Sequence, residues 1–534
     1  LKNVAATVAC FTVSLMLFTG CEKDDPTPEP DNGIAEIGKT YVSTTANAEK
    51  VYTLKVSKSL LKSTATATDI YVLLYVDKSG EVKTSTGVVT SSVGESLILT
   101  PTGGTPFTVN VTANGITGIS GNITFTDNST ATGGNLTPFA NGEIEITGES
   151  VIVNGQEQIQ LKDERVLGVP GMAINYVYNG TGLLAVKEGK TLTVLPGTTI
   201  RFTQTGGGIE IKSGATVKML GEDKLRELDA AGNLSAIPGT KNGHVTLKGG
   251  VTKGSWEGVY VKSTNNNEFN YVDFINGGSE ESSVNVYAVL DIYDAKIGIS
   301  HCKISGGLAY GIRFHGTCNI TAFDNNLIEN CVTPVHTLSI YDVEKFDLTS
   351  TFTNNTNKYI EVYIQGTIDR KDVVLNETSV PYYFTNSLGV LDKKFTINEG
   401  VQIYLQTDRD FISWTAPSEG ALLVKGTVEK PVLFTRLPGA TGYWGTIYVR
   451  QLVGSSIKNC VFEYGGYDVD GMMYLYNGLS LENVTFRNSY SYGVRIYAGF
   501  SGSITHSNVK FENNNGGNVY CNSSIYNTLE GAGL

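Results

Sequence analysis

The chain repeats one motif, Asn-x-x-Phe, three times near its end: KNCVFEYGG (458–466), ENVTFRNS (482–489) and SNVKFENN (507–514). The phenylalanines of the motif are 24 and 25 residues apart, at Phe462, Phe486 and Phe511. A period of roughly 20 to 50 residues is typical of solenoids and other repeat arrays. The period is long enough for three short strands and three turns but too short for a propeller blade, and the leucine-rich pattern is absent. The spacing therefore predicts a coiled chain whose turns stack on one another.

Such a coil places like residues over like. Strands in neighbouring turns lie about 4.8 Å apart, so in-register phenylalanines are at stacking distance. The asparagines of the motif stand at one edge of the same strand, at Asn459, Asn483 and Asn508. Asparagine tolerates turn geometry and can hydrogen-bond to a stacked neighbour. We therefore expect a continuous column of phenylalanine with asparagine beside it.

The motif belongs to an internal duplication. With a constant offset of 188, GSWEGVYVKSTNNNEFNYVDFINGG (254–278) matches GYWGTIYVRQLVGSSIKNCVFEYGG (442–466), so that Trp256 corresponds to Trp444 and Phe274 to Phe462. Flanking matches keep the same order: LTVLPGTTIRF (192–202) with FTINEGVQIYL (395–405), and ISHCKISGGLAYGIRF (299–314) with LENVTFRNSYSYGVRI (481–496). In the first copy the short period recurs at Phe274, Ile304 and Ile328. That copy also carries an insertion, 222–243, with the clearest helical pattern of the chain, EDKLRELDAAG (222–232).

Composition indicates an all-β protein. Val, Ile, Thr, Tyr and Phe recur in short runs separated by Gly, Asn, Asp and Ser, which is the pattern of many short strands. The net charge is −12 and no Lys/Arg cluster is present, which argues against nucleic-acid binding. The seven cysteines form no C-x-x-C pair and the five histidines lack ligand spacing, so we expect no zinc site. Five cysteines are expected in the interior as small apolar residues, with their disulfide state left open: Cys302, Cys318, Cys331, Cys460 and Cys521.

Residues 1–20 have the profile of a signal peptide, with an apolar stretch between Lys2 and Cys21 that is marginal for a bilayer span. The segment Phe18-Thr19-Gly20-Cys21 resembles the lipobox of bacterial lipoproteins, with Phe18 in place of the usual leucine. This resemblance implies that Cys21 becomes the acylated N-terminus and anchors the protein to a membrane. An uncleaved N-terminal anchor helix is the alternative.

Residues 21–37 are acidic and contain proline, which predicts an extended tether. Lys23-Asp24-Asp25 resembles the export signal of surface lipoproteins of Bacteroidota-type bacteria, which implies an outer-membrane protein facing the cell exterior. A solvated linker is the alternative. Residues 38–142 then predict a small antiparallel β domain, with strands on both sides of Lys78-Ser79-Gly80 and a hairpin near Asn114-Gly115. We interpret this domain as a spacer or a binding module.

From about Gly142 to the end, the chain resembles right-handed parallel β-helix proteins of the pectin-lyase-like fold. The element I-x-I-x-x-G-A (209–215) and the G-x-W element before an apolar strand look like those of surface β-helix lipoproteins of Bacteroidota. We divide this part into a first half, 143–350, and a second half, 351–534. The resemblance implies the fold but no single function, because this fold includes lyases, hydrolases, adhesins and tailspikes.

Enzymes of the fold family that depolymerise acidic polysaccharides carry motifs that this chain lacks. The Arg-x-Pro-x-x-Arg element of pectate lyases is absent. The nearest matches to the hydrolase motifs Gly-His-Gly and Arg-Ile-Lys are FHGT (314–317) and RIY (495–497), and neither is complete. We therefore assign no catalytic residue and no cofactor, with calcium left open.

Two duplicated constellations remain as candidate ligand-facing residues. Acidic residues follow a Gly pair in both copies and could hold calcium or act as an acid/base pair, or else belong to solvated loops: Glu280, Glu281, Asp468 and Asp470. Arg313 and Arg495 occupy matched outward positions, from which a guanidinium could bind a uronate or sulfate, or else protect the sheet.

Several aromatic residues occupy matched positions in the two copies. Tyr260 and Tyr448 are outward candidates for stacking on sugar rings, or else for stiffening the sheet. Trp256 and Trp444 are expected to be packing anchors at a coil corner. Catalytic sites are usually single, so duplication favours non-catalytic roles. The leading interpretation is therefore a non-enzymatic glycan-binding or adhesion module, with a polysaccharide lyase or hydrolase and a structural surface spacer as alternatives.

Overall fold

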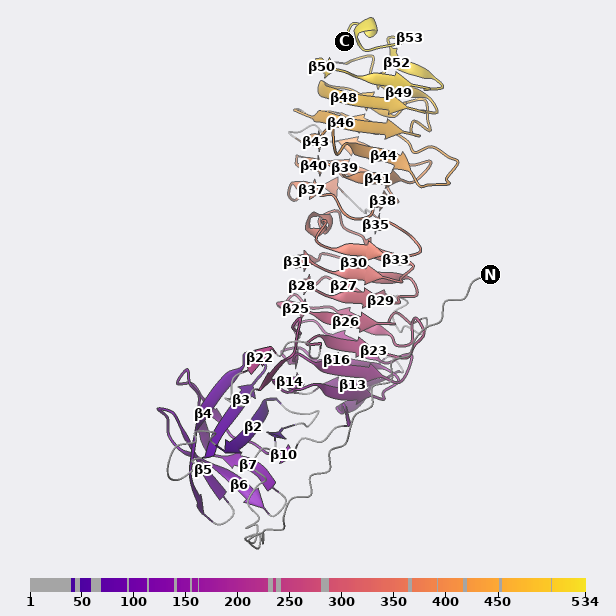
Figure 1. The fold of residues 1–534 in the computed structure, drawn as a ribbon. Helices are drawn as coiled ribbons and strands as arrows, with labels where there is room; N and C mark the ends of the chain where they lie inside the picture. Colours follow the sequence, from indigo (N-terminus) through magenta and orange to yellow (C-terminus); the bar gives the residue numbers. More distant parts are fainter. Residues whose placement is uncertain are drawn as a thin grey trace, which may run out of the picture.

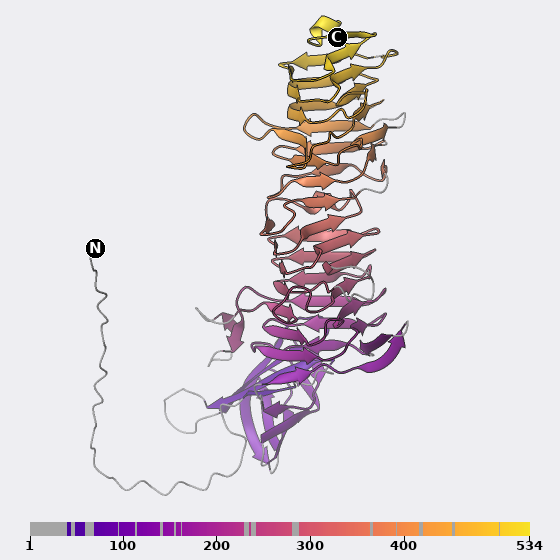
Figure 2. The same ribbon diagram turned by 90° about the vertical axis from the view of Figure 1, so that its right-hand side faces the viewer.

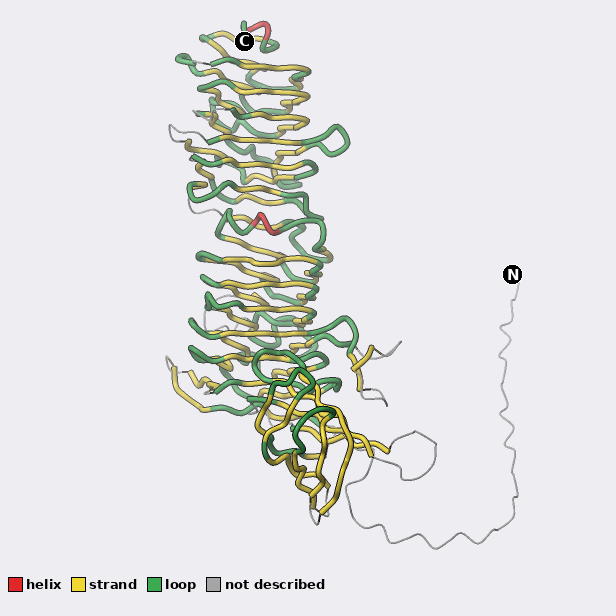
Figure 3. The backbone as a smooth tube through the Cα atoms, turned by 90° about the vertical axis from the view of Figure 1, so that its left-hand side faces the viewer, coloured by secondary structure: helices red, strands yellow, loops and turns green. Residues whose placement is uncertain are grey.

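The computed structural model is an almost purely β protein in which an antiparallel sheet is followed by a long parallel β-solenoid of about 13 turns (Figures 1 and 2). It describes residues 40–43, 49–58, 69–93, 96–112, 115–138, 142–153, 156–161, 163–228, 234–236, 242–279, 288–363, 367–390, 392–415, 420–450, 454–500 and 502–534. The predicted signal peptide with Cys21, the tether and the Glu280–Glu281 pair lie outside these residues. The described helices are two 3₁₀ turns, η1 (Val343–Lys345) and η2 (Glu530–Ala532) (Figure 3).

The N-terminal module is an eight-stranded antiparallel sheet, as predicted. In spatial order its strands are β10 (Thr137–Pro138), β1 (Thr40–Val42), β2 (Val51–Lys58), β3 (Asp69–Val76), β4 (Lys83–Val93), β5 (Ser96–Pro101), β6 (Phe107–Thr112) and β7 (Gly115–Ser120). A small hairpin, β8 (Asn122–Thr124) with β9 (Thr130–Thr132), follows. The alternating residues Phe107, Val109 and Val111 are buried in the core of the module, which confirms the period-two prediction.

In the first half of the solenoid, each coil contributes strands to three sheets. The side sheet contains β11 (Glu143–Glu145), β15 (Ile174–Tyr178), β18 (Thr198–Phe202), β23 (Val245–Lys248), β26 (Val272–Ile275), β29 (Lys303–Ser305), β32 (Leu327–Glu329) and β34 (Thr351–Thr353). The groove sheet contains β14 (Arg165–Leu167), β17 (Thr191–Val194), β20 (Thr216–Leu220), β25 (Asn267–Asn270), β28 (Lys296–Ser300) and β31 (Asn319–Asp324).

The third sheet, which we call the central sheet, has 19 strands and runs through both halves. Its strands in the first half are β12 (Glu149–Val153), β13 (Gln156–Leu161), β16 (Leu183–Val186), β19 (Gly208–Ile211), β24 (Gly258–Val261), β27 (Ala288–Tyr293), β30 (Tyr310–His315) and β33 (Thr333–Thr337). It continues with β35 (Ile360–Val362), β37 (Val373–Leu375), β38 (Tyr382–Phe384), β40 (Lys394–Asn398), β41 (Gln402–Leu405), β43 (Ala421–Lys425), β44 (Val432–Arg436), β46 (Ser456–Glu463), β48 (Leu479–Arg487), β50 (Ile504–Ser507) and β51 (Lys510–Glu512).

A further sheet, which we call the tyrosine sheet, is confined to the second half. It contains β36 (Thr367–Ile368), β39 (Leu388–Val390), β42 (Ile412–Thr415), β45 (Ile447–Val449), β47 (Met473–Leu475), β49 (Tyr492–Ile496), β52 (Gly517–Cys521) and β53 (Ser524–Tyr526). Strand pairs in the solenoid are parallel except at its ends, where β12–β13 and β52–β53 form antiparallel hairpins.

The predicted phenylalanine column is confirmed. Phe462, Phe486 and Phe511 are in register on neighbouring strands, with ring centroids 5.2 and 5.5 Å apart and nearly parallel planes. The register extends this column down the whole central sheet, through Leu184, Ile209, Val259, Leu290, Ile312, Val335, Ile360, Tyr382, Ile403 and Phe434. One apolar residue per coil thus forms a single core along the solenoid.

The two copies of the duplication join with a shift of one sheet. Phe274, Ile304 and Ile328 stack in the side sheet as predicted, and that column ends at Phe352 in β34. Phe462, which corresponds to Phe274 in sequence, lies instead in the central sheet. The central sheet continues across the junction through β35, which pairs with β33 of the first half on one side and with β38 of the second half on the other. Corresponding residues of the two copies therefore do not share a face.

The asparagines of the motif form the expected ladder. Asn459, Asn483 and Asn508 all have left-handed backbone conformations, with φ of 47°, 54° and 52°. Each side-chain amide donates to the coil below: Asn508 Nδ2 to Asn483 Oδ1 at 2.8 Å, Asn483 Nδ2 to Asn459 Oδ1 at 3.0 Å, and Asn459 Nδ2 to the Gly426 carbonyl at 2.8 Å. The ladder fixes the bend that lets β46 and β48 follow two faces of the coil.

Residues 222–228, the described part of the segment 222–232, are not helical, so the prediction is wrong there. Arg226–Leu228 form β21, which pairs antiparallel with β22 (Leu234–Ala236), and Lys224 pairs with Asn242. Leu225 is buried beside Gly197 of the solenoid. Pairing and this contact hold the segment extended, and they override its helical propensity.

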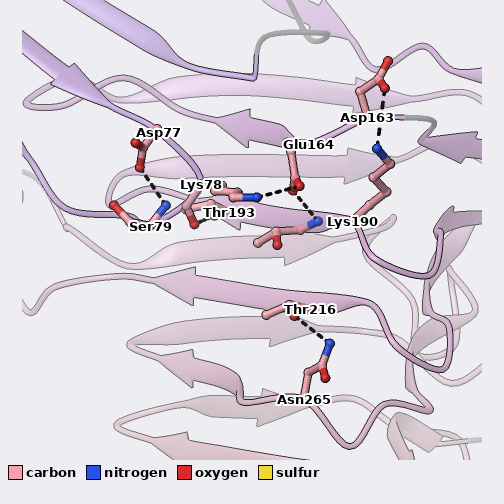
Figure 4. A network of polar contacts seen from close by, with 10 residues as sticks. Asp77, Lys78, Ser79, Asp163, Glu164, Lys190, Thr193, Thr216 and Asn265 are labelled. Carbon is pink, nitrogen blue, oxygen red and sulfur yellow. Dashed lines mark hydrogen bonds and ion pairs between the residues drawn. The ribbon is translucent and has the colours of Figure 1, made fainter. Parts of the chain in front are cut away.

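The module is fixed to the groove sheet by the turn between β3 and β4 (Figure 4). Lys78 Nζ donates to Glu164 Oε1 at 2.9 Å, and Thr193 Oγ1 donates to the Lys78 carbonyl at 2.8 Å. Glu164 Oε2 also accepts from the Thr191 amide at 2.6 Å. A small apolar cluster spans the same junction, formed by Val51, Val76, Val166 and Leu195. The first coil thus has a polar and an apolar attachment to the module.

We predict that Asn483→Ala destabilises the protein more than Asn483→Gly. Both changes remove two ladder hydrogen bonds, each worth about 1 kcal/mol, but alanine also strains the left-handed backbone by about 1–2 kcal/mol. Urea denaturation of the three proteins measures the difference. An equal loss for Ala and Gly would show that the backbone conformation contributes nothing.

We also predict that Asp342→Asn increases the stability of the protein by an amount that depends on pH. Burial raises the pKa of Asp342 to about 7, against a hydrogen bond from Thr337 and the nearby Lys371 charge, which lower it. The unfolded carboxyl titrates near pH 4, so the wild-type protein loses stability as pH rises from about 4 to about 7, by up to roughly 4 kcal/mol. The variant lacks this loss, and its advantage in thermal stability should grow across that window and level off above it. A pH-independent difference would contradict the assignment.

Candidate functional site

The outward face of the tyrosine sheet carries a row of aromatic and arginine side chains. Register places Tyr448, Tyr474, Arg495 and Tyr520 above one another on β45, β47, β49 and β52. Side chains alternate across a strand, so the next outward positions form a second row, Arg450, Tyr476 and Tyr497. The ring centroids of Tyr476 and Tyr497 are 4.5 Å apart, and those of Tyr474 and Tyr476 are 4.7 Å apart.

Two arginines hold these rows together. The Arg495 guanidinium lies 4.9 Å from the Tyr474 ring centroid and 5.3 Å from that of Tyr520. The Arg450 guanidinium lies 5.0 Å from Tyr448 and 4.7 Å from Tyr476. Such cation–π contacts are worth about 0.5–2 kcal/mol each, so the face is rigid as well as aromatic.

Arg495 also pairs with Asp470, which brings together two residues that the sequence analysis considered separately. The Asp470 carboxylate accepts from Arg495 Nη1 through one oxygen and from the Tyr448 hydroxyl, at 2.8 Å, through the other. Burial raises the pKa of Tyr448 above its usual value, and its hydrogen bond to Asp470 raises that pKa further. The Tyr448 hydroxyl therefore stays protonated at physiological pH and donates a hydrogen bond to Asp470.

The loop between Gly466 and Gly471 separates the two candidate aspartates. Asp468 is exposed, and its Oδ1 atom accepts from the Val469 amide at 2.6 Å, within its own loop. Asp470 turns back to Arg495 instead. Within the described ranges, no group of three His, Cys, Asp or Glu residues is arranged to hold a metal ion. Asp468 therefore contacts its own loop, and Asp470 contacts the tyrosine row.

Arg313 lies on another face, the central sheet. Ile312 and Phe314 point inward and are fully buried, and Arg313 points outward, as predicted. Its row continues in register through Asp291, Arg313, His336 and Glu361. Arg313 Nη1 lies 4.0 Å from Asp291 Oδ1, and His336 Nδ1 lies 3.2 Å from Glu361 Oε2. In this row Arg313 lies next to Asp291 and His336 lies next to Glu361, so each carboxylate has a basic side chain beside it and no two carboxylates are adjacent.

The incomplete enzyme motifs do not assemble into one site. His315 of FHGT lies on the central sheet, with Nε2 2.8 Å from Asp291 Oδ1, whereas Arg495 and Tyr497 of RIY lie on the tyrosine sheet. The one-sheet shift between the copies separates them. It also separates Arg313 from Arg495, although the two match in sequence.

The matched tryptophans are packing residues, as predicted. Trp256 and Trp444 are fully buried, and their indole nitrogens donate to the carbonyls of Ile275 and Glu463 at 2.7 and 2.8 Å. The prediction that Tyr260 is outward and exposed is wrong in its second part, because neighbouring side chains cover the ring completely. Tyr448 is half-buried beneath Arg450.

The described cysteines form no disulfide. Cys302, Cys331, Cys460 and Cys521 are buried, which confirms their interior location, and Cys318 is half-buried. Burial raises the pKa of the Cys302 and Cys318 thiols to about 12, so both stay protonated.

Sequence analysis missed most of the tyrosine rows. A signal was present in the alternating pairs Tyr448-x-Arg450, Tyr474-x-Tyr476 and Arg495-x-Tyr497, which recur about once per coil. Matching the two copies drew attention to residues that both share, and Tyr474, Tyr476 and Tyr520 fall outside the matched stretches.

No family model, curated protein or solved structure matches this chain. Among the described residues, no helix is long and apolar enough to cross a bilayer.

We predict measurable coupling between Arg495 and Asp470. Their side chains are only 24% and 21% exposed, so a double-mutant cycle with Arg495→Gln and Asp470→Asn should give about 1 kcal/mol. The same cycle at Lys458–Glu482, which are 53% and 46% exposed, should give less than about 0.5 kcal/mol. Equal couplings would mean that the aromatic row does not shield the pair.

Proposed function

We propose that this protein is a cell-surface lipoprotein whose solenoid binds glycans without cleaving them, through the tyrosine sheet. The observation that carries the proposal is the double row of tyrosine and arginine on one flat face. Tyr497 is 42% exposed, and Tyr448, Tyr476 and Tyr520 are partly exposed beside it. An exposed aromatic ring offers a sugar an apolar face and, in tyrosine, a polar edge.

The polar groups of the face suit a sugar as well. Hydroxyls both donate and accept, and the rows offer donors in Arg450 and Arg495 and acceptors in Asp468 and Asp470. Because the rows are spaced by the strands, a linear glycan lying along the solenoid would meet a similar group at every coil. The cation–π contacts of Arg450 and Arg495 hold these side chains in place before a glycan binds, which lowers the entropic cost of association.

The surface location is proposed from the sequence. Acylation at Cys21 would anchor the chain, and the acidic tether 21–37 would hold the folded part away from the membrane. A glycan-binding face in the C-terminal half, far from Cys21 in the sequence, then suits attachment to polysaccharide or to a host glycan.

A structural spacer is the second candidate, and one observation favours it. The Arg495 guanidinium contacts Tyr474, Tyr520 and Asp470, which all belong to the protein's own coils. A ladder of this kind stiffens a solenoid whether or not a ligand binds. The two candidates differ in whether removal of an exposed ring changes glycan retention.

We predict that Tyr497→Ala weakens retention of a bound polysaccharide in affinity gel electrophoresis by several-fold, because it removes the most exposed ring of the rows. Tyr293→Ala is the matched control, since Tyr293 is also 42% exposed but lies on the central sheet. The polysaccharide should keep its length during incubation. Equal retention of a polysaccharide by the two variants would favour the spacer. So would equal retention of all polysaccharides, or retention of none. Shortening of the polymer would indicate an enzyme.

A further inference from the structure

The groove sheet carries a hollow that the tyrosine sheet lacks. Its outward row runs in register through Lys218, Glu268, Gly298 and Ala322 on β20, β25, β28 and β31. Gly298 and Ala322 have little or no side chain, so the surface beside them is lower than at Lys218 and Glu268. The result is an open groove of about 690 Å³ along the coils, within the size range of ligand sites.

Small residues keep the floor of this groove open. A Cβ at Gly298 would lie 3.1 Å from Thr321 Oγ1 and would begin to fill the space. The floor is otherwise closed, because Phe269 beneath it is fully buried. The groove therefore offers a ligand backbone and small side chains below and longer polar side chains at the sides.

The walls are polar, and their charges cancel. Two lysines, Lys218 and Lys296, face two acids, Glu268 and Asp324. Asp324 is already engaged, since its Oδ1 accepts from Ser300 Oγ at 2.7 Å and its Oδ2 from Asn325 Nδ2 at 3.0 Å. The remaining polar lining consists of amides, hydroxyls and one imidazole, from Asn266, Asn267, Asn270, Ser300, Thr321 and His301.

The groove is also preformed. At one end, Lys218 Nζ donates to the Ser79 carbonyl of the module turn at 3.1 Å, and Figure 4 shows that turn against the neighbouring coils. At the side, the His301 ring stacks on Tyr271 with centroids 4.4 Å apart. The buried Nδ1 atom of His301 has no hydrogen-bond partner among the described residues, so stacking alone orients the ring.

From these features we propose that the groove binds an uncharged, hydroxyl-rich oligosaccharide lying along the solenoid. A net neutral groove gives an acidic chain no overall Coulomb gain, because each lysine is accompanied by a carboxylate. Mixed donors and acceptors match sugar hydroxyls, which do both. A peptide strand is a poorer fit, because the backbone groups of this sheet already pair within it.

This site does not depend on the tyrosine-sheet proposal. The groove is centred near β28 and the tyrosine rows near β47, and the coil of Leu290 is separated from that of Phe462 by seven steps of the central column. At about 4.8 Å per step, the two sites lie on the order of 30 Å apart on different faces. A long polysaccharide that reaches both would gain avidity, whereas a short oligosaccharide would occupy one.

The test uses short probes on the full chain, in calorimetric titrations. Neutral hexasaccharides of glucose (α- and β-linked) and of mannose are compared with hexagalacturonate. We expect at least one neutral probe to bind about tenfold more tightly than the acidic probe, with affinity that changes little with salt. Ala322→Phe should abolish this binding by filling the groove. Val251→Phe adds the same ring at a position that is 98% exposed and should leave this binding unchanged. Tyr497→Ala is titrated in parallel to report any binding of the probe at the tyrosine sheet.

Each other outcome overturns the proposal. Binding that survives in folded Ala322→Phe would place the ligand elsewhere, and loss in Tyr497→Ala alone would assign it to the tyrosine sheet. Binding of hexagalacturonate only, or of no neutral probe, would reject the uncharged class. If Ala322→Phe does not fold, Lys296→Ala decides, because loss of this wall donor should weaken the neutral probe about fivefold. Unchanged affinity in that variant would also reject the site.

Discussion

The in-register parallel pairing of successive coils is the constraint on which the rest of this structure depends. Each coil must place its residues directly over those of the coil below, so chemistry repeats along rows. Inside, this gives one apolar column from Leu184 to Phe511, with stacked rings at its upper end. Outside, a row of like charges would repel, and the rows avoid this by placing an acid beside a basic side chain, as at Asp291–Arg313, or arginine between tyrosines, as at Arg495. The candidate binding faces are thus products of the same rule that builds the core.

The shift at β35 explains why a duplicated sequence does not give a duplicated surface. Val259 corresponds in sequence to Ile447, yet the sheet of Val259 continues through Ile360 to Phe462 and not to Ile447. Equivalent residues therefore face different directions and gain different neighbours. Arg313 meets Asp291 and Arg495 meets Asp470, and only the second lies among exposed tyrosines. The duplication supplied similar coils, and the junction made their faces distinct.

Residues whose role is set within one period were predictable from the sequence. Phe462, Phe486 and Phe511 stack because their spacing equals the coil, and Asn483 adopts the left-handed turn that its side chain favours. Residues whose role depends on other coils were not. Tyr260 looks outward by alternation but is covered by neighbours, and the segment Lys224–Leu228 is extended because Asn242 and β22 pair with it. The one-sheet shift and the groove at Gly298 and Ala322 arise from register between coils, which a single sequence does not display.

The two terminal hairpins have a consequence for the behaviour of many copies at high density. An open parallel stack would present a bare strand at each end, on which an identical molecule could add, and the same again, until a fibre formed. Here β12 covers the N-terminal end of the central sheet and β53 covers the C-terminal end of the tyrosine sheet, and both run against the direction of the stack. A second molecule that added a strand there would meet an antiparallel edge strand, and it could not stack identical residues in register as successive coils do. At these two sheet ends the hairpins therefore disfavour end-to-end addition of further copies, which favours separate rods in a crowded layer.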